Sequence, residues 1–232
     1  MLNGINFNSI IERLSLNQKK FVVEVIGTFI VVVLATGSVV IDAKMDGNLG
    51  LFFIALFPSI GVAIGVYLFG KVSMAHLNPA VTLGFLITKH ITKNQLLLYL
   101  SAEIIGALLA SLFIKFVVGS EADLGANSPN YIFPLHLIFG VEILASALLM
   151  IVILIVVHTK GLKGFSGIVI GGIVGLDIFF LAFISGASMN PARSLAPALV
   201  TGVLGNLWLY WTATFIGTGI IAALYRKKFL DK

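Results

Sequence analysis

The polar residues best suited to chemistry lie in two similar stretches of otherwise apolar sequence. HLNPAVTLGFL at 76–86 and NPARSLAPALV at 190–200 both contain Asn-Pro-Ala, and Asn78 and Asn190 are 112 positions apart. Pro suits the first turn of a helix, where its missing N–H is not needed, and Asn is a favoured N-cap. Each Asn-Pro-Ala therefore predicts a helix start, at Asn78, Pro79 and Ala80 and at Asn190, Pro191 and Ala192.

These two helix starts offer hydrogen-bond donors and positive charge. The side-chain amides of Asn78 and Asn190 can donate hydrogen bonds, and a helix N-terminus behaves like roughly half a positive charge. Arg193 adds a full charge about one helical turn beyond Asn190. Opposed half-helices and an Arg can keep cations and protons out of a pore. The chemistry indicated is the lining of a polar path, and not a reaction.

The composition places this path in a membrane. The chain has 232 residues, of which 59% are hydrophobic and 11% charged, and its mean hydropathy is +1.08. Soluble domains carry roughly 25% charged residues. The absence of Cys excludes disulfides, thiol chemistry and Cys-based metal sites. The four His residues are scattered along the chain, so we expect neither a metal nor a cofactor.

Six stretches are long enough to span a bilayer, which needs about 20 apolar residues. They are roughly 21–41, 51–70, 95–118, 135–157, 165–184 and 206–225. Two more, 78–88 and 190–200, are apolar but too short to span, and both begin at Asn-Pro-Ala. We therefore predict an all-α membrane protein with six transmembrane helices and two re-entrant half-helices.

The two halves of the chain follow one order of elements. Each has a first long helix with a Glu (Glu24 or Glu142), a Gly-rich second helix, a half-helix and a third long helix. Three spans per half is an odd number, so the second half must enter from the opposite side, as an inverted repeat. We expect a single channel domain over 1–232, with a first repeat at 20–120 and a second at 133–226. The N-termini of the half-helices would meet near the membrane midplane.

The basic residues predict the orientation. Twelve of the fifteen Lys and Arg residues lie in segments that share one side when both termini are cytoplasmic. The positive-inside rule favours that arrangement, in a multi-pass protein of the cell membrane. Residues 1–20 lack the apolar core of a signal peptide. Their apolar residues allow either an interfacial helix or a frayed tail.

HLNPAVTLG and NPARS, at this spacing, resemble the aquaporin and glycerol-facilitator (major intrinsic protein) family over about residues 20–226. The resemblance implies a passive water pore in every subunit and assembly as a homotetramer. Glu24 and Glu142 match buried glutamates that support the pore-lining loops in this family. His76 matches a histidine near the first box.

The resemblance also places a selectivity filter. Counting from the boxes gives Arg193, Ala187, Ile178 and Pro58, with Phe57 beside Pro58. Water-specific members usually carry an aromatic residue at the Pro58 position and a His at the Ile178 position. An apolar Ile and a small Ala imply a wider filter that admits glycerol, urea or ammonia. Ser194 and the pair Tyr210-Trp211 instead match the water-type members.

Two other classes of protein compete with a passive channel. An ion-coupled transporter can also be built on inverted repeats, and it would need a membrane carboxylate that faces the substrate; Asp177 and Glu103 are the candidates. An intramembrane enzyme is not expected, because the sequence has no HExxH or GxSxG motif and no paired catalytic carboxylates.

Overall fold

The computed structural model describes residues 14–231, so the predictions for the N-terminal segment fall mostly outside the described residues. Six of the described helices are long and apolar enough to cross a membrane, which confirms the six predicted spans. They are α2 (Leu16–Lys44), α3 (Gly50–Ser73), α5 (Lys93–Phe113), α7 (Leu135–His158), α8 (Ser166–Ser185) and α10 (Leu207–Phe229). A π-helical turn, η1 (Ile114–Val118), continues α5.

The two predicted half-helices are also present, as α4 (Pro79–Ile87) and α9 (Pro191–Thr201). Each begins at its Pro, and the preceding Asn is the N-cap. Asn78 Oδ1 accepts a hydrogen bond from Ala80 N at 2.9 Å, and Asn190 Oδ1 accepts one from Ala192 N at 3.0 Å. The local sequence therefore sets both helix starts.

Two further short elements connect the long helices. A turn labelled α6 (Glu121–Gly125) contains three residues with left-handed backbone angles, Ala122 to Leu124. A 3-10 helix, η2 (Lys160–Phe165), joins α7 to α8. The described residues form no strand, which agrees with the predicted all-α class.

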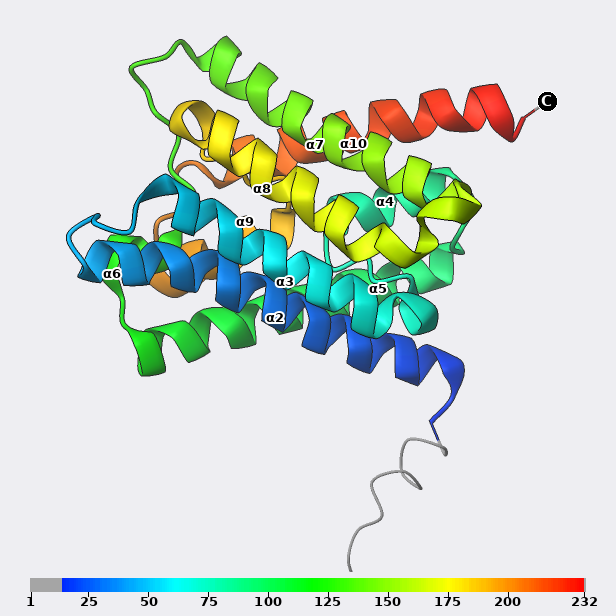
Figure 1. Cartoon of the computed structure of the whole chain (residues 1–232), viewed down its shortest axis with the longest axis horizontal. Coiled ribbons are helices and arrows are strands. Elements are labelled where there is room, and N and C mark those ends of the chain that lie inside the picture. The colour runs from blue at the N-terminus through cyan, green and yellow to red at the C-terminus, as the bar shows by residue number, and fades with distance from the viewer. Residues whose placement is uncertain (1–13, 232) are drawn as a thin grey trace, which may run out of the picture.

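The long helices run roughly side by side, with the two short helices among them (Figure 1). In the first half α2 packs against α3 and α5, and in the second half α7 packs against α8 and α10. The halves meet where α3 contacts α8, where α4 contacts α10, and where α9 contacts α5. Each half-helix is thus held partly by the opposite half. The repeat boundaries of 20–120 and 133–226 remain a prediction.

One Gly in each half brings two helices into backbone contact. A Cβ added to Gly106 on α5 would lie 2.4 Å from Val25 O on α2. A Cβ added to Gly217 on α10 would lie 2.3 Å from Ile143 O on α7. No side chain fits at either position, so both crossings depend on Gly. The same close approach occurs at matching places in the two halves.

Candidate functional site

The loops before the two half-helices share an uncommon backbone conformation. Met74, Ala75 and Leu77 have φ angles of 71°, 49° and 54°, and Ala187 and Met189 have φ angles of 41° and 54°. L-residues rarely adopt this left-handed region, and the surrounding structure must hold them there. Ala75 and Leu77 match Ala187 and Met189 at the 112-residue spacing of the boxes, and Met74 matches Gly186, whose φ is 88°.

A buried carboxylate binds each of these loops. Glu24 accepts hydrogen bonds from His76 N at 2.9 Å and Leu77 N at 2.8 Å, and from the Ser73 hydroxyl at 2.5 Å. Glu142 accepts one from Met189 N at 2.7 Å and one from the Ser185 hydroxyl at 2.9 Å. Both glutamates are fully buried. Each therefore satisfies backbone donors that would otherwise be orphaned inside the membrane.

A Tyr and a Ser complete the support in each half. The Tyr99 hydroxyl donates to Ser73 O at 2.7 Å, and the Tyr210 hydroxyl donates to Ser185 O at 2.6 Å. Trp211, the neighbour of Tyr210, donates from Nε1 to Pro191 O at 3.2 Å. The end of α3 and the end of α8 are thereby fixed to the third long helix of their own half.

The two Asn-Pro-Ala boxes are bonded to each other across the junction. Asn78 Nδ2 donates to Met189 O at 2.8 Å, and Asn190 Nδ2 donates to Leu77 O at 2.9 Å. The N-terminal ends of α4 and α9 therefore meet, as the inverted repeat predicts. Each amide uses one of its two N–H hydrogens in this contact, and the other is left for the path beside it.

A cavity of about 520 Å³ passes this junction. It extends from Val157 near the C-terminal end of α7 to Phe183 near the C-terminal end of α8. These ends lie at opposite sides of the molecule, because α7 and α8 are consecutive antiparallel helices. Apolar residues form much of its wall, among them Val62, Val66, Leu149, Ile153 and Val174. The polar lining includes residues His76, Asn78, Asn190 and Arg193.

Four of the five residues predicted for the filter line this cavity: Pro58, Ile178, Ala187 and Arg193. Phe57 does not belong to the lining, and its ring packs on Phe53 with 4.4 Å between centroids. Pro58 is buried inside α3 and faces the cavity. Of the two candidates on this helix, the structure therefore brings Pro58 to the other filter residues and not Phe57.

The partner of Arg193 is a residue that no sequence motif indicates. Asn127, in the loop before α7, accepts hydrogen bonds from Arg193 Nη1 at 2.5 Å and from the Ser194 hydroxyl at 2.8 Å. Its Nδ2 donates to Gly186 O at 3.0 Å, so one amide bonds both to Arg193 and to the backbone just before Ala187. Among the described residues, no carboxylate forms an ion pair with Arg193. Arg193 is therefore held at the cavity wall by a neutral amide and not by a carboxylate in direct contact.

Asp177 and Glu103, the two candidates for an ion-coupling carboxylate, are buried away from the cavity. Asp177 is 4% exposed and Glu103 is fully buried, and neither belongs to the cavity lining. Asp177 Oδ2 and Glu103 Oε2 have no hydrogen-bond partner among the described residues. A substrate in the cavity would not touch either carboxylate.

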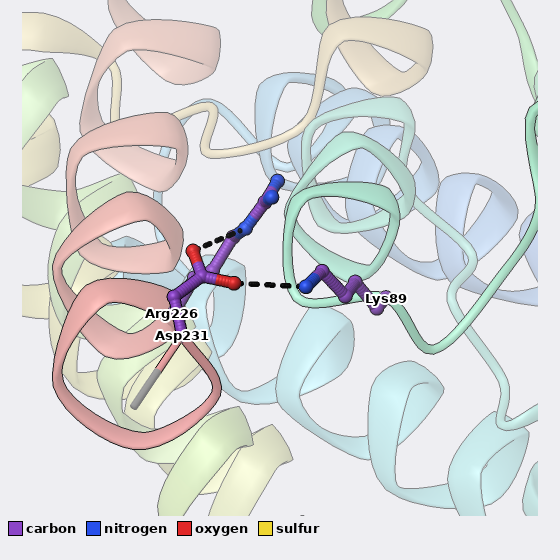
Figure 2. Close-up of polar contacts among 3 residues, drawn as sticks. All are labelled: Lys89, Arg226 and Asp231. Atoms are coloured by element: carbon purple, nitrogen blue, oxygen red, sulfur yellow. Dashed lines mark hydrogen bonds and ion pairs between the residues drawn. The ribbon is translucent and has the colours of Figure 1, made fainter.

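A separate polar cluster joins the end of α4 to the end of α10 (Figure 2). Asp231 accepts from Lys89 Nζ at 2.8 Å and from Arg226 Nε at 2.9 Å. The hydrogen bond from Lys89 is the main reason that the pKa of Asp231 lies below its usual range. All three side chains are exposed, so these ion pairs contribute little stability.

His90 lies beside this cluster, in the loop after α4. Its ring centroid is 5.2 Å from that of Phe85, which lines the cavity, and 5.2 Å from that of His158. Partial burial lowers the pKa of His90 below 6.5, and the nearby His158 lowers it further. The ring therefore favours the neutral form.

The fold and this site define a class: a six-helix membrane protein whose two half-helices meet beside an internal cavity. The profile of the family described as "Major intrinsic protein" matches residues 12–225. The chain belongs to this family.

Individual relatives agree with this assignment. The chain is 36% identical to the putative aquaporin NIP4-1 of Arabidopsis thaliana, over 92% of this chain and 76% of that protein. It is 35% identical to the probable aquaporin AqpM of Archaeoglobus fulgidus, over 92% of this chain and 97% of that protein. The fold is similar to that of the aquaglyceroporin from Plasmodium falciparum, with a TM-score of 0.78 and 22% identity over 92% of this chain and 97% of that one.

Proposed function

We propose that this protein is a passive transmembrane channel for water and for small neutral solutes such as glycerol, urea or ammonia, and that it excludes protons and ions. The observation that carries the proposal is one cavity lined by both Asn-Pro-Ala boxes and by Arg193. Family relatives described as aquaporins support the same class of cargo. The proposal involves no catalytic step and no cofactor.

Proton exclusion follows from donors at the junction. A water between Asn78 and Asn190 accepts the remaining amide N–H of each residue through its oxygen. Both of its own hydrogens then point away along the file, which interrupts the donor–acceptor relay that proton hopping needs. The positive ends of α4 and α9 and the charge of Arg193 oppose any cation at the same place.

The side chains at the predicted filter support passage of solutes larger than water. Pro58, Ile178 and Ala187 offer no side-chain hydrogen-bond donor, so Arg193 is the main donor among the four. A polyol or amide can bond to Arg193 and to nearby carbonyls while its carbon atoms contact Ile178 and Pro58. The fold shared with a protein titled an aquaglyceroporin agrees with such a pore.

An ion-coupled transporter is the competing proposal, and the position of the carboxylates argues against it. Asp177 and Glu103 do not line the cavity, so ion binding at either would not reach a substrate there. The transporter would require an ion gradient for flux, and the channel does not. Osmotic shrinkage of proteoliposomes with and without such a gradient separates the two.

The assembly and the orientation are part of the proposal. We propose a homotetramer in the cell membrane, with each subunit holding its own pore and both termini in the cytoplasm. The basic loops support the orientation. Mass measurement of the detergent-solubilised protein tests the tetramer, and protease treatment of intact cells tests the side on which the termini lie.

The filter residues give the sharpest test of the cargo. Stopped-flow measurements on proteoliposomes compare water, glycerol, urea and ammonia for the unmodified protein and for Ile178→His. The added donor and bulk should reduce glycerol and urea flux more than water flux. If the unmodified protein passes nothing larger than water and Ile178→His changes nothing, residue 178 does not set selectivity.

A further inference from the structure

Glu103 is a third buried carboxyl group, and the proposed conduction path does not use it. It lies on α5, and its Oε1 accepts hydrogen bonds from Asn78 N at 3.2 Å and from the Thr82 hydroxyl at 2.6 Å. Its Oε2 is buried without a partner. One carboxyl oxygen therefore contacts both the N-cap and the first turn of α4.

The hydroxyl of Thr82 has a second neighbour, the ring of His76. Thr82 Oγ1 lies 2.8 Å from His76 Nδ1. A hydroxyl has one hydrogen, and a carboxyl oxygen that already receives a backbone N–H acts as an acceptor. Thr82 therefore donates to Glu103 and must accept from His76. The hydrogen of the neutral imidazole then lies on Nδ1, and Nε2 carries none.

The surroundings of His76 disfavour a hydrogen on the other nitrogen. Nε2 is buried and has no hydrogen-bond partner among the described residues. The ring lies between Tyr99 and Phe85, with centroids 4.2 and 4.5 Å away. A hydrogen on Nε2 would be a buried, unsatisfied donor beside aromatic rings, which is unfavourable.

We propose that Glu103 is a positioning residue of the first Asn-Pro-Ala box, which fixes the direction of the Glu103–Thr82–His76 hydrogen bonds and thereby the Nδ1–H tautomer of His76. Since His76 lines the cavity, this chain keeps a neutral ring with no hydrogen on Nε2 beside the path. Only the expected effect on water flux rests on the proposed channel function. The tautomer itself is a property of the folded protein.

The test uses the full chain in lipid vesicles and nitrogen NMR of ¹⁵N-labelled histidine. His76→Gln identifies the His76 signals, because His90, His136 and His158 remain. We expect Nδ1 of His76 to appear as an N–H nitrogen and Nε2 as a bare ring nitrogen. Glu103→Gln keeps an acceptor oxygen and should keep this pattern. Glu103→Leu and Thr82→Val should each replace it with a mixture of tautomers or with the Nε2–H form.

Thr214→Val is the matched control. Thr214 is the counterpart on α10 of Glu103 on α5, but it donates to Tyr210 O of its own helix. This variant should leave the His76 signals unchanged. Water permeability should fall severalfold in Glu103→Leu and be retained in Glu103→Gln. An Nε2–H tautomer in the unmodified protein, or an Nδ1–H tautomer that persists in both Glu103→Leu and Thr82→Val, would overturn the proposal. Absence of water flux in the unmodified protein would overturn the channel function and leave the tautomer result standing.

Discussion

The two halves of the molecule build the junction with the same contacts. In each, a buried Glu accepts hydrogen bonds from one or two backbone N–H groups before the half-helix and from a Ser hydroxyl, and a Tyr hydroxyl donates to the carbonyl of that Ser. Each Asn donates to the carbonyl that precedes the opposite Asn. The meeting point of α4 and α9 is therefore close to symmetric in its backbone.

The halves differ in the side chains that carry charge. Arg193 follows the second box at the place that Val81 holds after the first. Glu103 contacts the first half-helix, while its counterpart Thr214 bonds only to its own helix. The shared contacts hold the two helix starts, and we propose that the few unmatched residues determine what each side of the junction presents to a solute. Variants at matched positions can separate these two contributions.

The largest effect is expected where the two halves are alike. Glu24→Leu removes the acceptor of three donors and Glu142→Leu that of two. Each buried donor left unpaired costs about 1–3 kcal/mol, so the free energy of unfolding should fall by about 2–6 kcal/mol or more. Thermal unfolding in detergent measures the loss, which should be larger for Glu24→Leu. Two leucine variants as stable as the unmodified protein would show that the glutamates do not hold the loops.

The next effect concerns the strongest difference between the halves. Arg193→Val makes the second box match the first and removes a unit charge. At an effective dielectric of about 20, that charge repels a cation about 7 Å away by roughly 2 kcal/mol, so cation or proton leak should rise about 30-fold. A pH-sensitive dye inside proteoliposomes measures the leak. Val81→Ala is the control and should add no leak. Equal leak in both variants would show that the charge of Arg193 does not exclude cations or protons.

A smaller effect is expected for the residue that holds Arg193. Asn127→Ala removes a hydrogen bond to a charged group, which restrains Arg193 by about 1.5–3 kcal/mol. The charge stays, so leak and glycerol flux should rise less than in Arg193→Val. Asn130→Ala is the matched control on the same loop, because Asn130 donates to Phe183 O and not to the filter. If the Asn130 variant changes glycerol flux as much, the effect comes from the loop and not from Arg193.

The smallest expected effect is a change in how stability depends on pH. It arises in the first half alone, because the counterpart of His90 in the second half is Gly202. The pKa of His90 lies below 6.5 in the folded protein because burial disfavours its charged form. At this residue the unfolded chain binds more protons than the folded protein, so the contribution of His90 to stability should fall as the pH drops below about 6.5. Between neutral and acidic pH, the unfolding midpoint should depend less steeply on pH in His90→Asn than in the unmodified protein. His136→Asn is the control, because His136 is exposed at the start of α7, and this variant should keep the pH dependence of the unmodified protein.

Local sequence signals account for the parts that could be predicted. Asn followed by Pro defines a helix start through capping alone, and apolar length defines a span through the bilayer. The orientation of Pro58 and Phe57 could not be predicted, because α3 is apolar on every side and offers no polar face to set its rotation. Asn127 lies in a loop without periodicity, and only the folded chain brings it to Arg193. Nor could the sequence indicate that each Asn amide donates one hydrogen bond across the junction.

We propose that the junction of the two halves passes water and stops protons. Osmotic water flow and proton leak, measured in the same proteoliposomes for the unmodified protein, test this proposal. We expect water flow above that of empty vesicles, independent of any ion gradient, with proton leak no higher than in empty vesicles. A proton current that depends on the protein, or water flow no faster than through lipid alone, would contradict it.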